Sequence, residues 1–439
     1  MIYFSTNKSS IPVSIKQATL HGLAPDGGLY IPSEMPRFSE AELRLLEGAT
    51  FNNIAFAIAK KFIGAEIPPD QLGDIVENCY NFDTPLVRLD ANTFVEELFC
   101  GPTLAFKDYG ARFLARLTGY FAQEEQRLIT VLVATSGDTG SAVAFGFQGV
   151  PNTRVVLLYP SGKVSRLQEQ QLTTAGGNVH ALEVRGDFDD CQRLVKQAFV
   201  DPQLNQSLTL TSANSINISR LVPQSFYYAW ASMHIRERFG MKDPLFSVPS
   251  GNYGNLTAGV MAKMLGFPIG HFIAASNAND SVTRYLDDGR YDPHPTITTL
   301  STAMDVGNPS NFARLRYFYG NDHAAMGRDI TGISVSDQET IATIHSVYDR
   351  FGYVIDPHTA VAFRALERYR TDGGGNLELP GIVLSTAHPS KFIETIQDTL
   401  RREIDIPERL SSLLEKKKQA TLISSDYREL ASYLDNLDR

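Results

Sequence analysis

The sequence contains little cysteine, no excess of basic residues and no long apolar run. Its three cysteines, Cys79, Cys100 and Cys191, lack the spacing of a disulfide framework or of a zinc site. The formal net charge of −9 argues against nucleic acid or an anionic membrane as a partner, because both require a basic face. No stretch approaches the roughly 18 apolar residues of a membrane span, and the first residues lack the apolar core of a signal peptide. We therefore expect a soluble, cytoplasmic protein that holds no metal.

The 439 residues are too many for a single ordinary domain, and this length predicts about two or three. A hydrophobic content of 43% with 20% charged residues is typical of a globular protein with a large core. The pattern of apolar residues predicts a mostly helical N-terminal domain over residues 1–90. It further predicts an α/β region of two subdomains over 91–400 and a helical C-terminal tail over 401–439.

Capping boxes mark two of the expected helix starts. Ser39 is followed by Glu42, and Ser336 is followed by Glu339, in each case three residues later. In this pattern the serine hydroxyl accepts a hydrogen bond from an amide of the first turn, and the carboxylate accepts one from the serine amide. We therefore expect a helix to begin directly after each serine.

Apolar strands alternate with helical segments through the central region. The stretches LITVLVAT (128–135), RVVLLYP (154–160) and GIVLSTA (381–387) contain almost no charged residues. Strands of this kind, separated by helices, predict parallel sheets that are covered by helices on both faces. Ligands of such sheets bind beyond the carboxyl ends of the strands, and the glycine-rich turns of this chain fall at those ends.

The stretch SVPSGNYGNLTAG, residues 247–259, carries the strongest local signal. A strand is expected to end at Ser250, Gly251 and Gly254 bracket a turn, and a helix follows from about Asn255. Glycines let backbone N–H groups converge on an anion, and a helix N-terminus adds its partial positive charge. The turn lacks the GKS or GKT of a nucleotide P-loop. Taken alone, the motif is explained equally well by anion binding and by a plain strand–helix turn.

A second turn of the same kind, ATSGDTGSA, spans residues 134–142. The hydroxyls of Ser136 and Thr139, together with free amides at a helix start, are suited to hold a small carboxylate. The alternative is a helix cap in which Ser136 and Asp138 satisfy the amides of the first turn. For this turn by itself the cap is the better explanation.

Two further turns carry polar residues after a strand. In LSTAHPSKF (384–392), Thr386 ends a strand, and its hydroxyl is either a ligand group or a cap. In YPSGKVSRLQEQQ (159–171), Lys163 and Arg166 lie near a helix start, where cations oppose the helix dipole unless an anion sits between them. Solvated surface charge is the alternative explanation for each cation.

Lys107 lies in the stretch FCGPTLAFKDYG, residues 99–110, directly after Phe106. Apolar surroundings disfavour the ammonium form and lower the pKa of a lysine from about 10.4, which leaves a reactive neutral amine. A desolvated lysine together with several anion-ready turns predicts pyridoxal 5'-phosphate as the cofactor and a phosphorylated amino acid as the substrate.

Six stretches of the sequence occur in the order typical of one enzyme family. GLAPDGGLYIP, GPTLAFKD, ATSGDTGSA, SANSINISR, VPSGNYGN and STAHPSKF resemble the motifs of the threonine synthases, in the long form with an extra N-terminal domain. The resemblance extends from about residue 20 to residue 395. It implies the fold type II architecture of pyridoxal-phosphate enzymes and the formation of threonine.

The resemblance also implies roles for residues around the cofactor. Lys107 would be the Schiff-base lysine and would also move the α-proton of the substrate. Thr386 would place its hydroxyl near the pyridine nitrogen. The cofactor phosphate would be held by Gly251, Asn252, Tyr253 and Gly254.

The implied substrate is O-phospho-L-homoserine, which reacts with water to give L-threonine and phosphate. The SGDTG turn would hold the substrate carboxylate through Ser136, Asp138 and Thr139. Lys163 is the first candidate for the substrate phosphate, and Asn214 in SANSINISR is a further substrate-binding candidate. Cys100 stands where the family commonly has a histidine, so no role is assigned to that position. The sequence implies no protein partner.

Two other functions compete with this one. The first is an amino-acid dehydratase or another β-elimination enzyme on the same fold. Such an enzyme does not need a cation such as Lys163 to bind a substrate phosphate. The second is a phosphate-binding or regulatory protein that has kept the fold and lost the reaction. An intact Lys107 argues against the second function, because binding alone needs no neutral lysine.

Overall fold

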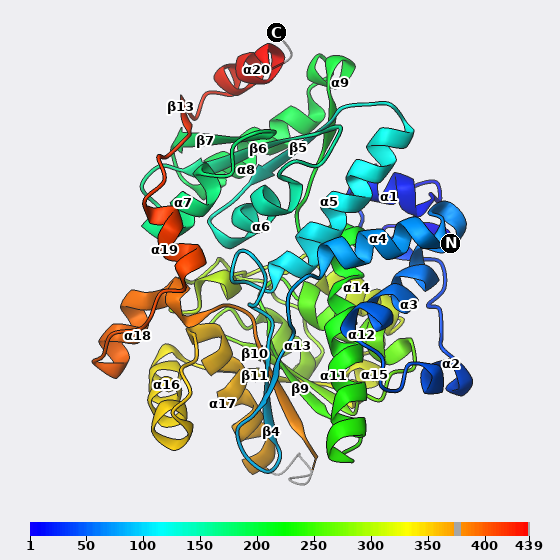
Figure 1. The fold of residues 1–439 in the computed structure, drawn as a ribbon, viewed down its shortest axis with the longest axis vertical. Helices are drawn as coiled ribbons and strands as arrows, with labels where there is room; N and C mark the ends of the chain where they lie inside the picture. Colours follow the sequence, from blue (N-terminus) through cyan, green and yellow to red (C-terminus); the bar gives the residue numbers. More distant parts are fainter. Residues whose placement is uncertain (373–378, 438–439) are drawn as a thin grey trace.

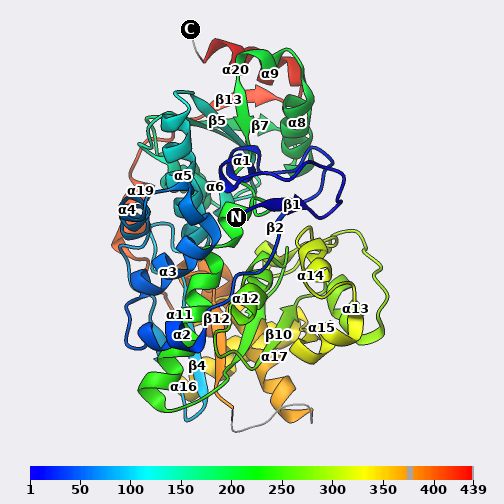
Figure 2. The same cartoon turned by 90° about the vertical axis from the view of Figure 1, so that its right-hand side faces the viewer.

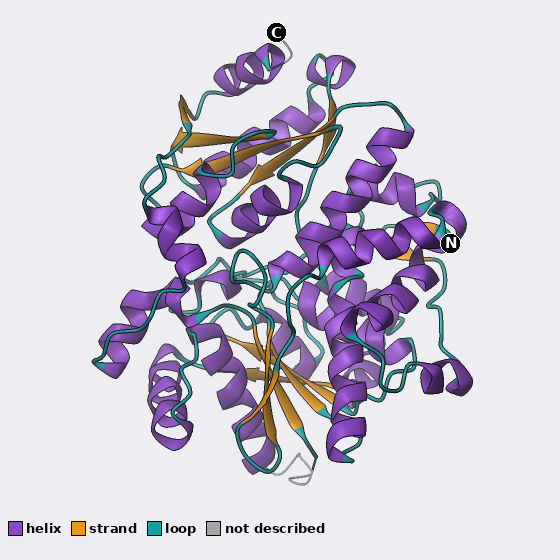
Figure 3. Cartoon of the chain, in the orientation of Figure 1, coloured by secondary structure: helices purple, strands orange, loops and turns teal. Residues whose placement is uncertain are grey.

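The computed structural model describes residues 1–372 and 379–437, and its two large sheets lie at opposite ends of the molecule (Figures 1 and 3). A band of helices and loops lies between the two sheets (Figure 3). The carboxyl ends of the strands are followed by the glycine-rich turns, so the layout determines where a ligand can bind. No helix in the described ranges combines the length and the apolar character needed to cross a membrane.

The first large sheet has five parallel strands in the order β13-β7-β6-β5-β8. Alternate side chains of its central strands face two different cores, because successive residues of a strand point to opposite faces. Helices α5 and α6 cover one face, and helices α8, α9 and α20 cover the other. The strands are β5 (Ile129–Ala134), β6 (Thr153–Pro160), β7 (Val179–Arg185), β8 (Thr209–Thr211) and β13 (Thr421–Ser424). The helices around it are α5 (Lys107–Glu124), α6 (Asp138–Phe147), α7 (Arg166–Thr173), α8 (Phe188–Val200), α9 (Leu204–Ser207), α19 (Glu408–Leu414) and α20 (Tyr427–Asn436).

The second large sheet has six strands in the order β11-β10-β9-β12-β4-β3, and only the edge strand β3 runs antiparallel to its neighbour. Helices α16 and α17 cover one face, and α11 and α12 cover the other. The strands are β3 (Leu86–Arg88), β4 (Thr93–Glu97), β9 (Leu245–Pro249), β10 (His271–Ser276), β11 (Ile330–Ser334) and β12 (Gly381–Ser385). The helices are α10 (Ile218–Leu221), α11 (Gln224–Phe239), α12 (Gly254–Met264), α13 (Ser281–Asp288), α14 (Phe312–Phe318), α15 (His323–Asp329), α16 (Asp337–Phe351), α17 (Pro357–Thr371) and α18 (Ile393–Leu400), with short 3₁₀ turns η2 (Thr302–Met304) and η3 (Pro389–Phe392).

The N-terminal segment wraps the side of the molecule, with the N-terminus near its middle (Figure 2). A two-stranded antiparallel sheet of β1 and β2 is followed by helices whose apolar faces pack on α5 and α11. The elements are β1 (Tyr3–Ser5), α1 (Ile15–His21), β2 (Tyr30–Pro32), α2 (Glu40–Leu45), α3 (Phe51–Ile63), η1 (Gly64–Glu66) and α4 (Pro69–Cys79).

The predicted fold class is confirmed by two mainly parallel sheets with helices on both faces. The capping boxes of Ser39 and Ser336 are both formed, and their helices begin one residue later. The tail predicted as helical is not entirely so, because strand β13 adds to the edge of β7. Its four residues, TLIS, are half exposed and too few to show strand periodicity. The last two residues of the predicted tail, 438–439, lie outside the described residues.

Gly110 sets the distance between the helix that begins at Lys107 and its neighbour α10. A Cβ atom on Gly110 would lie 2.7 Å from the carbonyl oxygen of Arg220, which is backbone and cannot rotate away. The close approach of α5 and α10 therefore depends on the missing side chain.

We expect Gly110→Ala to destabilise the protein by about 1–3 kcal/mol, because the two helices must separate. The matched control is Gly73→Ala in α4, where a Cβ would make only an ordinary contact with Phe56 at 4.0 Å. Since alanine is the better helix former, this control should stabilise by about 0.5–1 kcal/mol. Urea unfolding of both variants measures the sign of each change in the free energy of unfolding. A Gly110→Ala variant with unchanged stability would contradict the packing argument.

Candidate active site

The turn before Lys107 is attached to the end of strand β12. The amide of Phe106 donates to the carbonyl oxygen of Thr386 at 2.9 Å, and Ala105 forms a β-bridge with Ala387. Lys107 is the first residue of α5, and its side chain is 16% exposed. The backbone thus brings Lys107 and Thr386 to the same end of the second sheet, although 278 residues lie between them in the sequence.

Asp108 closes the turn that presents Lys107. Its carboxylate is fully buried and accepts hydrogen bonds from the Thr103 amide and the Thr103 hydroxyl, both at 2.8 Å. A side chain on Gly101 would collide with this carboxylate, since a Cβ there would lie 2.4 Å from an Asp108 oxygen. Leu104 takes a left-handed φ of 57° in the same turn. The Gly-Pro-Thr-Leu-Ala-Phe-Lys-Asp stretch is therefore one compact unit that fixes the lysine.

A buried carboxylate, Asp138, lies between two lysines. Its Oδ2 atom is 3.8 Å from Lys107 Nζ, and its Oδ1 atom is 2.7 Å from Lys391 Nζ. The Lys391 side chain is fully buried and also donates to the carbonyl oxygen of Thr103 at 3.1 Å. Gln168 Nε2 donates to Asp138 Oδ1 at 3.2 Å. This Lys107–Asp138–Lys391 triad joins the Lys107 turn, the start of α6 and the η3 turn after β12.

The triad shifts the pKa values of its members in opposite directions. Burial lowers the pKa of Lys107; Asp138 opposes that change, whereas the charges of Lys391 and Arg220 reinforce it. Burial would raise the pKa of Asp138, but the charges of Lys391 and Lys107 outweigh burial, and the net pKa lies below its ordinary value. Asp138 is therefore an anion while Lys107 is shifted toward the neutral amine that a covalent bond to an aldehyde requires.

The loop Gly251–Gly254 joins the carboxyl end of β9 to the start of α12. Tyr253 adopts a left-handed φ of 59°, and α12 begins at Gly254. Asn252 holds the loop on both sides: its Nδ2 donates to Ser215 Oγ at 2.7 Å, and its Oδ1 accepts from the Ser310 amide at 2.6 Å. A Cβ on Gly251 would lie 2.7 Å from the Met304 Cα atom, so this position admits no side chain.

These residues fit pyridoxal phosphate. The loop leaves amides free at the start of an eleven-residue helix, which suits a phosphate group. Lys107, with its lowered pKa, suits the aldehyde of the same molecule. Thr386, almost fully buried after β12, adds a hydroxyl near the turn of Lys107.

The SGDTG turn is not capped in the way that the sequence suggests as the alternative to ligand binding. Thr135, rather than Ser136 or Asp138, satisfies the turn, because its Oγ1 accepts from the amides of Gly137 and Gly140 at 3.0 and 2.8 Å. Ser136 is exposed and Thr139 half-buried, so both hydroxyls are accessible. The turn thus keeps its polar side chains available for other contacts.

The structure does not bring Lys163 into this cluster. Its side chain is exposed, and in the described part of the chain it forms no ion pair; the charge instead contributes to lowering the pKa of Asp190, after the larger effect of Arg193. Asn214 is half-buried, and its amide donates to Ser212 Oγ at 3.3 Å in the loop that also contacts Asn252.

Sequence reasoning missed two cations of the site. Lys391 lies within the motif STAHPSKF, but nothing local shows that its ammonium reaches Asp138, which lies 253 residues earlier in the sequence. Arg220 is 3% exposed, donates through Nη1 to the Ala213 carbonyl at 2.6 Å and contributes to the lowered pKa of Lys107. Neither cation stands out in its motif, because STAHPSKF and SANSINISR are both rich in polar residues.

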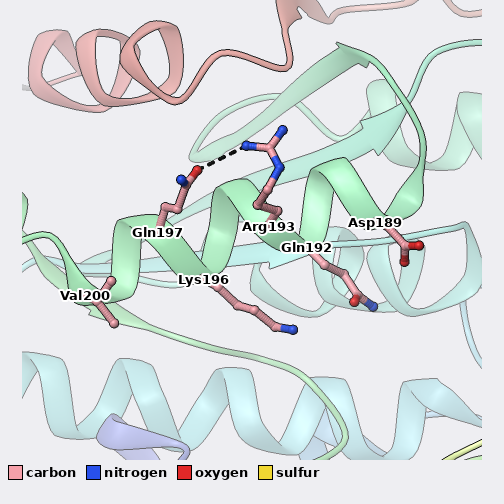
Figure 4. Close-up of a pocket in the computed structure, with 6 residues that line it drawn as sticks. All are labelled: Asp189, Gln192, Arg193, Lys196, Gln197 and Val200. Atoms are coloured by element: carbon pink, nitrogen blue, oxygen red, sulfur yellow. Dashed lines mark hydrogen bonds between the residues drawn. The ribbon is translucent and has the colours of Figure 1, made fainter.

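A shallow groove on α8 lies apart from this cluster (Figure 4). Within it, Arg193 Nη1 donates to Gln197 Oε1 at 3.3 Å. None of the candidate site residues lines it, so we assign it no part in the chemistry. The lining residues are Asp189, Gln192, Arg193, Lys196, Gln197 and Val200.

Comparison with known proteins covers the whole chain. Family descriptions match for the threonine synthase N terminus (residues 2–80), the pyridoxal-phosphate dependent enzymes (80–378) and the threonine synthase C-terminal region (359–434). The threonine synthase of Serratia marcescens is 42% identical over 425 residues, which are 97% of each chain. The chain belongs to the threonine synthase family.

Solved structures of the family agree with this assignment. The crystal structure of threonine synthase from Escherichia coli superimposes with a TM-score of 0.90 at 40% identity, over 99% of this chain and 100% of that chain. The pyridoxal-phosphate-bound threonine synthase from Brucella melitensis gives 0.93 at 36% identity, over 99% and 98%. The predicted family, activity and cofactor are thereby confirmed: the chain is a pyridoxal-phosphate-dependent lyase of threonine biosynthesis.

We expect substitutions on the two sides of Asp138 to move the pKa of Lys107 in opposite directions. Asp138→Asn removes the anion that favours the ammonium, so the pKa falls further. Lys391→Met removes a like charge and leaves Asp138 to Lys107 alone, so the pKa rises. The pH dependence of cofactor attachment to the apo protein measures the shift, because only the neutral amine reacts.

The control for this pair is Lys196→Met on the exposed side of α8, which should leave the midpoint of the pH dependence of cofactor attachment unchanged. At neutral pH the Lys391 variant should attach the cofactor more slowly than the unmodified protein. Shifts of the same sign in the Asp138 and Lys391 variants would contradict the electrostatic account.

Proposed function

We propose that the substrate is O-phospho-L-homoserine, which the protein converts with water to L-threonine and phosphate. The observation that supports this proposal is the convergence of Lys107, the Gly251–Gly254 loop and Thr386 at the carboxyl ends of strands in a chain that matches threonine synthases over its full length. The roles that the proposal gives to individual residues start from those predicted from the sequence.

Lys107 has two tasks in this proposal. It is the residue that holds the cofactor covalently, and its amine, when free, takes the proton from Cα of the substrate and later returns it. Bound pyridoxal phosphate supplies an electron sink for the carbanionic stages of the reaction. The lowered pKa of Lys107 suits both tasks, because each begins from the neutral amine.

The remaining residues position the reactants. Gly251, Asn252, Tyr253 and Gly254 hold the cofactor phosphate through backbone amides at the start of α12, and Thr386 offers its hydroxyl to the pyridine nitrogen. Asp138, fixed by Lys391 and Gln168, keeps its negative charge beside Lys107 and so orients that amine. Ser136 and Thr139, with the amides at the start of α6, bind the substrate carboxylate.

The substrate phosphate is assigned to the start of α7. Gln168, in the first turn of that helix, contacts Asp138, so the helix start lies close to the triad. Ser165 caps this helix in a capping box, and Arg166 is its first residue. Lys163 and Arg166 are both exposed there and add two positive charges to the partial charge of the helix end. Asn214 remains a further contact for the substrate.

We expect Lys107→Ala to lose at least about a hundredfold in turnover, since the covalent attachment and the proton transfer disappear together. The variant should still bind pyridoxal phosphate without a covalent bond. Borohydride reduction followed by mass spectrometry should add the cofactor mass to the unmodified protein and not to the variant. A variant that retains substantial release of phosphate from O-phosphohomoserine would refute the role of Lys107.

The substrate is tested by two single changes, Lys163→Ala and Arg166→Ala. Loss of a charge-assisted contact to the substrate phosphate should lower kcat/KM for O-phosphohomoserine roughly ten- to hundredfold. The same variants should change slow reactions of unphosphorylated serine or threonine much less, because those molecules carry no phosphate. Equal losses on both kinds of substrate would show that the start of α7 supports the fold instead.

A further inference from the structure

Arg314, in helix α14, is fully buried and makes four hydrogen bonds. Its Nε and Nη2 atoms donate to the carbonyl oxygen of Tyr30 at 3.0 and 2.9 Å. Nη2 also donates to the carbonyl oxygen of Ile216 at 2.6 Å, and Nη1 donates to Asn311 Oδ1 at 2.7 Å. All four acceptor bonds go to neutral groups.

In the part of the chain that the structure describes, no carboxylate compensates the positive charge of Arg314. Within residues 1–372 and 379–437 it forms no ion pair. Burial lowers the pKa of Arg314 to about 9, so the side chain is still a cation at neutral pH. It lies in the first turn of α14, where the helix dipole also disfavours a cation. A buried charge of this kind is costly unless an anion lies near it.

Arg314 is linked to the loop Gly251–Gly254 through Asn311. Asn311, which accepts from Arg314, places its Nδ2 atom 3.3 Å from the position of a Cβ on Gly254. The same Nδ2 atom donates to the carbonyl oxygen of Ser215 at 3.4 Å, and Ser215 Oγ accepts from Asn252. One side chain therefore separates the Arg314 guanidinium from the loop, and both are fixed to the segment Ser215–Ile216.

We infer that Arg314 is a positioning residue for the cofactor phosphate: its buried charge balances the phosphate held at Gly251–Gly254 and, through Asn311, keeps that loop in its binding shape. This inference rests on the phosphate site proposed above. It assigns a function to a residue that contacts neither the substrate nor the reacting atoms.

Arg314 also ties the N-terminal segment to the phosphate site. Tyr30 lies in strand β2, 284 residues before Arg314, and its carbonyl accepts two of the four hydrogen bonds. When the phosphate binds, its negative charge balances the charge of Arg314. The hydrogen bonds to Tyr30 then no longer keep an uncompensated cation in the protein interior. Docking of β2 and binding of the phosphate should therefore strengthen each other, as linkage requires.

The test compares two ligands that differ only in the phosphate, pyridoxal phosphate and pyridoxal, on the full-length apo protein. In general, two unit charges about 10 Å apart at an effective dielectric constant of about 20 interact strongly enough to change an affinity roughly tenfold, and a single side chain, Asn311, lies between Arg314 and the phosphate loop. Arg314→Met should therefore weaken pyridoxal phosphate at least about tenfold and pyridoxal less than about twofold. Arg314→Lys, which keeps the charge, should recover most of this difference.

The matched control is Arg316→Met, an exposed arginine two residues further along α14 whose Nε donates to Asn321. It should leave both affinities unchanged. Equal weakening of both ligands by Arg314→Met, or no weakening of either, would overturn the inference. The proposed site is tested separately by Gly254→Val: an unchanged affinity for pyridoxal phosphate there would refute the phosphate loop itself.

A measurement on the unmodified protein keeps the inference testable if Arg314→Met does not fold. Hydrogen exchange of the Tyr30–Pro32 segment should slow when pyridoxal phosphate binds and should slow much less with pyridoxal at saturation. Equal protection by both ligands would overturn the coupling between β2 and the phosphate, whatever the behaviour of the variants.

Discussion

The centre of this molecule depends on one buried carboxylate between two ammonium groups. Asp138 is almost fully buried. Its negative charge is stable there only because Lys391 contacts it at 2.7 Å and Lys107 lies 3.8 Å away. Three segments must meet for this to happen: the turn before α5, the start of α6 and the η3 turn. The geometry around Lys107 is therefore a consequence of charge balance as well as of backbone packing.

Local signals in the sequence predicted the parts of the fold that local physics controls. The apolar strands, the capping boxes at Ser39 and Ser336 and the turn at Gly251–Gly254 each depend on neighbouring residues, and each lies where the pattern indicated. Strand β13 escaped prediction because it has only four residues, two of them exposed, and they acquire strand structure only by pairing with β7. The pairing, and not the residues, makes it a strand.

In the candidate site, too, the sequence predicted what depends on neighbouring residues and missed what depends on distant ones. Lys107 carries its own signal, an amine in apolar surroundings after a turn, so sequence reasoning singled it out. The partner of Asp138 had no such signal, because Lys391 acts across a long separation in sequence. The capping role of Thr135 has a different, local cause: a sequence pattern does not distinguish Thr135 from its polar neighbours Ser136 and Asp138 as the cap.

The β-bridge between Ala105 and Ala387 places a constraint on biosynthesis. The segment that carries Lys107 leaves the ribosome early, whereas the strand end and the Lys391 ammonium that complete its surroundings emerge only after residue 385. Until then Asp138 lacks its closest counter-ion, and the turn before α5 lacks the backbone to which it is bonded. Contacts of such long sequence separation form late and slowly. A chain that stalls on the ribosome or is truncated before this point therefore carries Lys107 without the buried surroundings that lower its pKa.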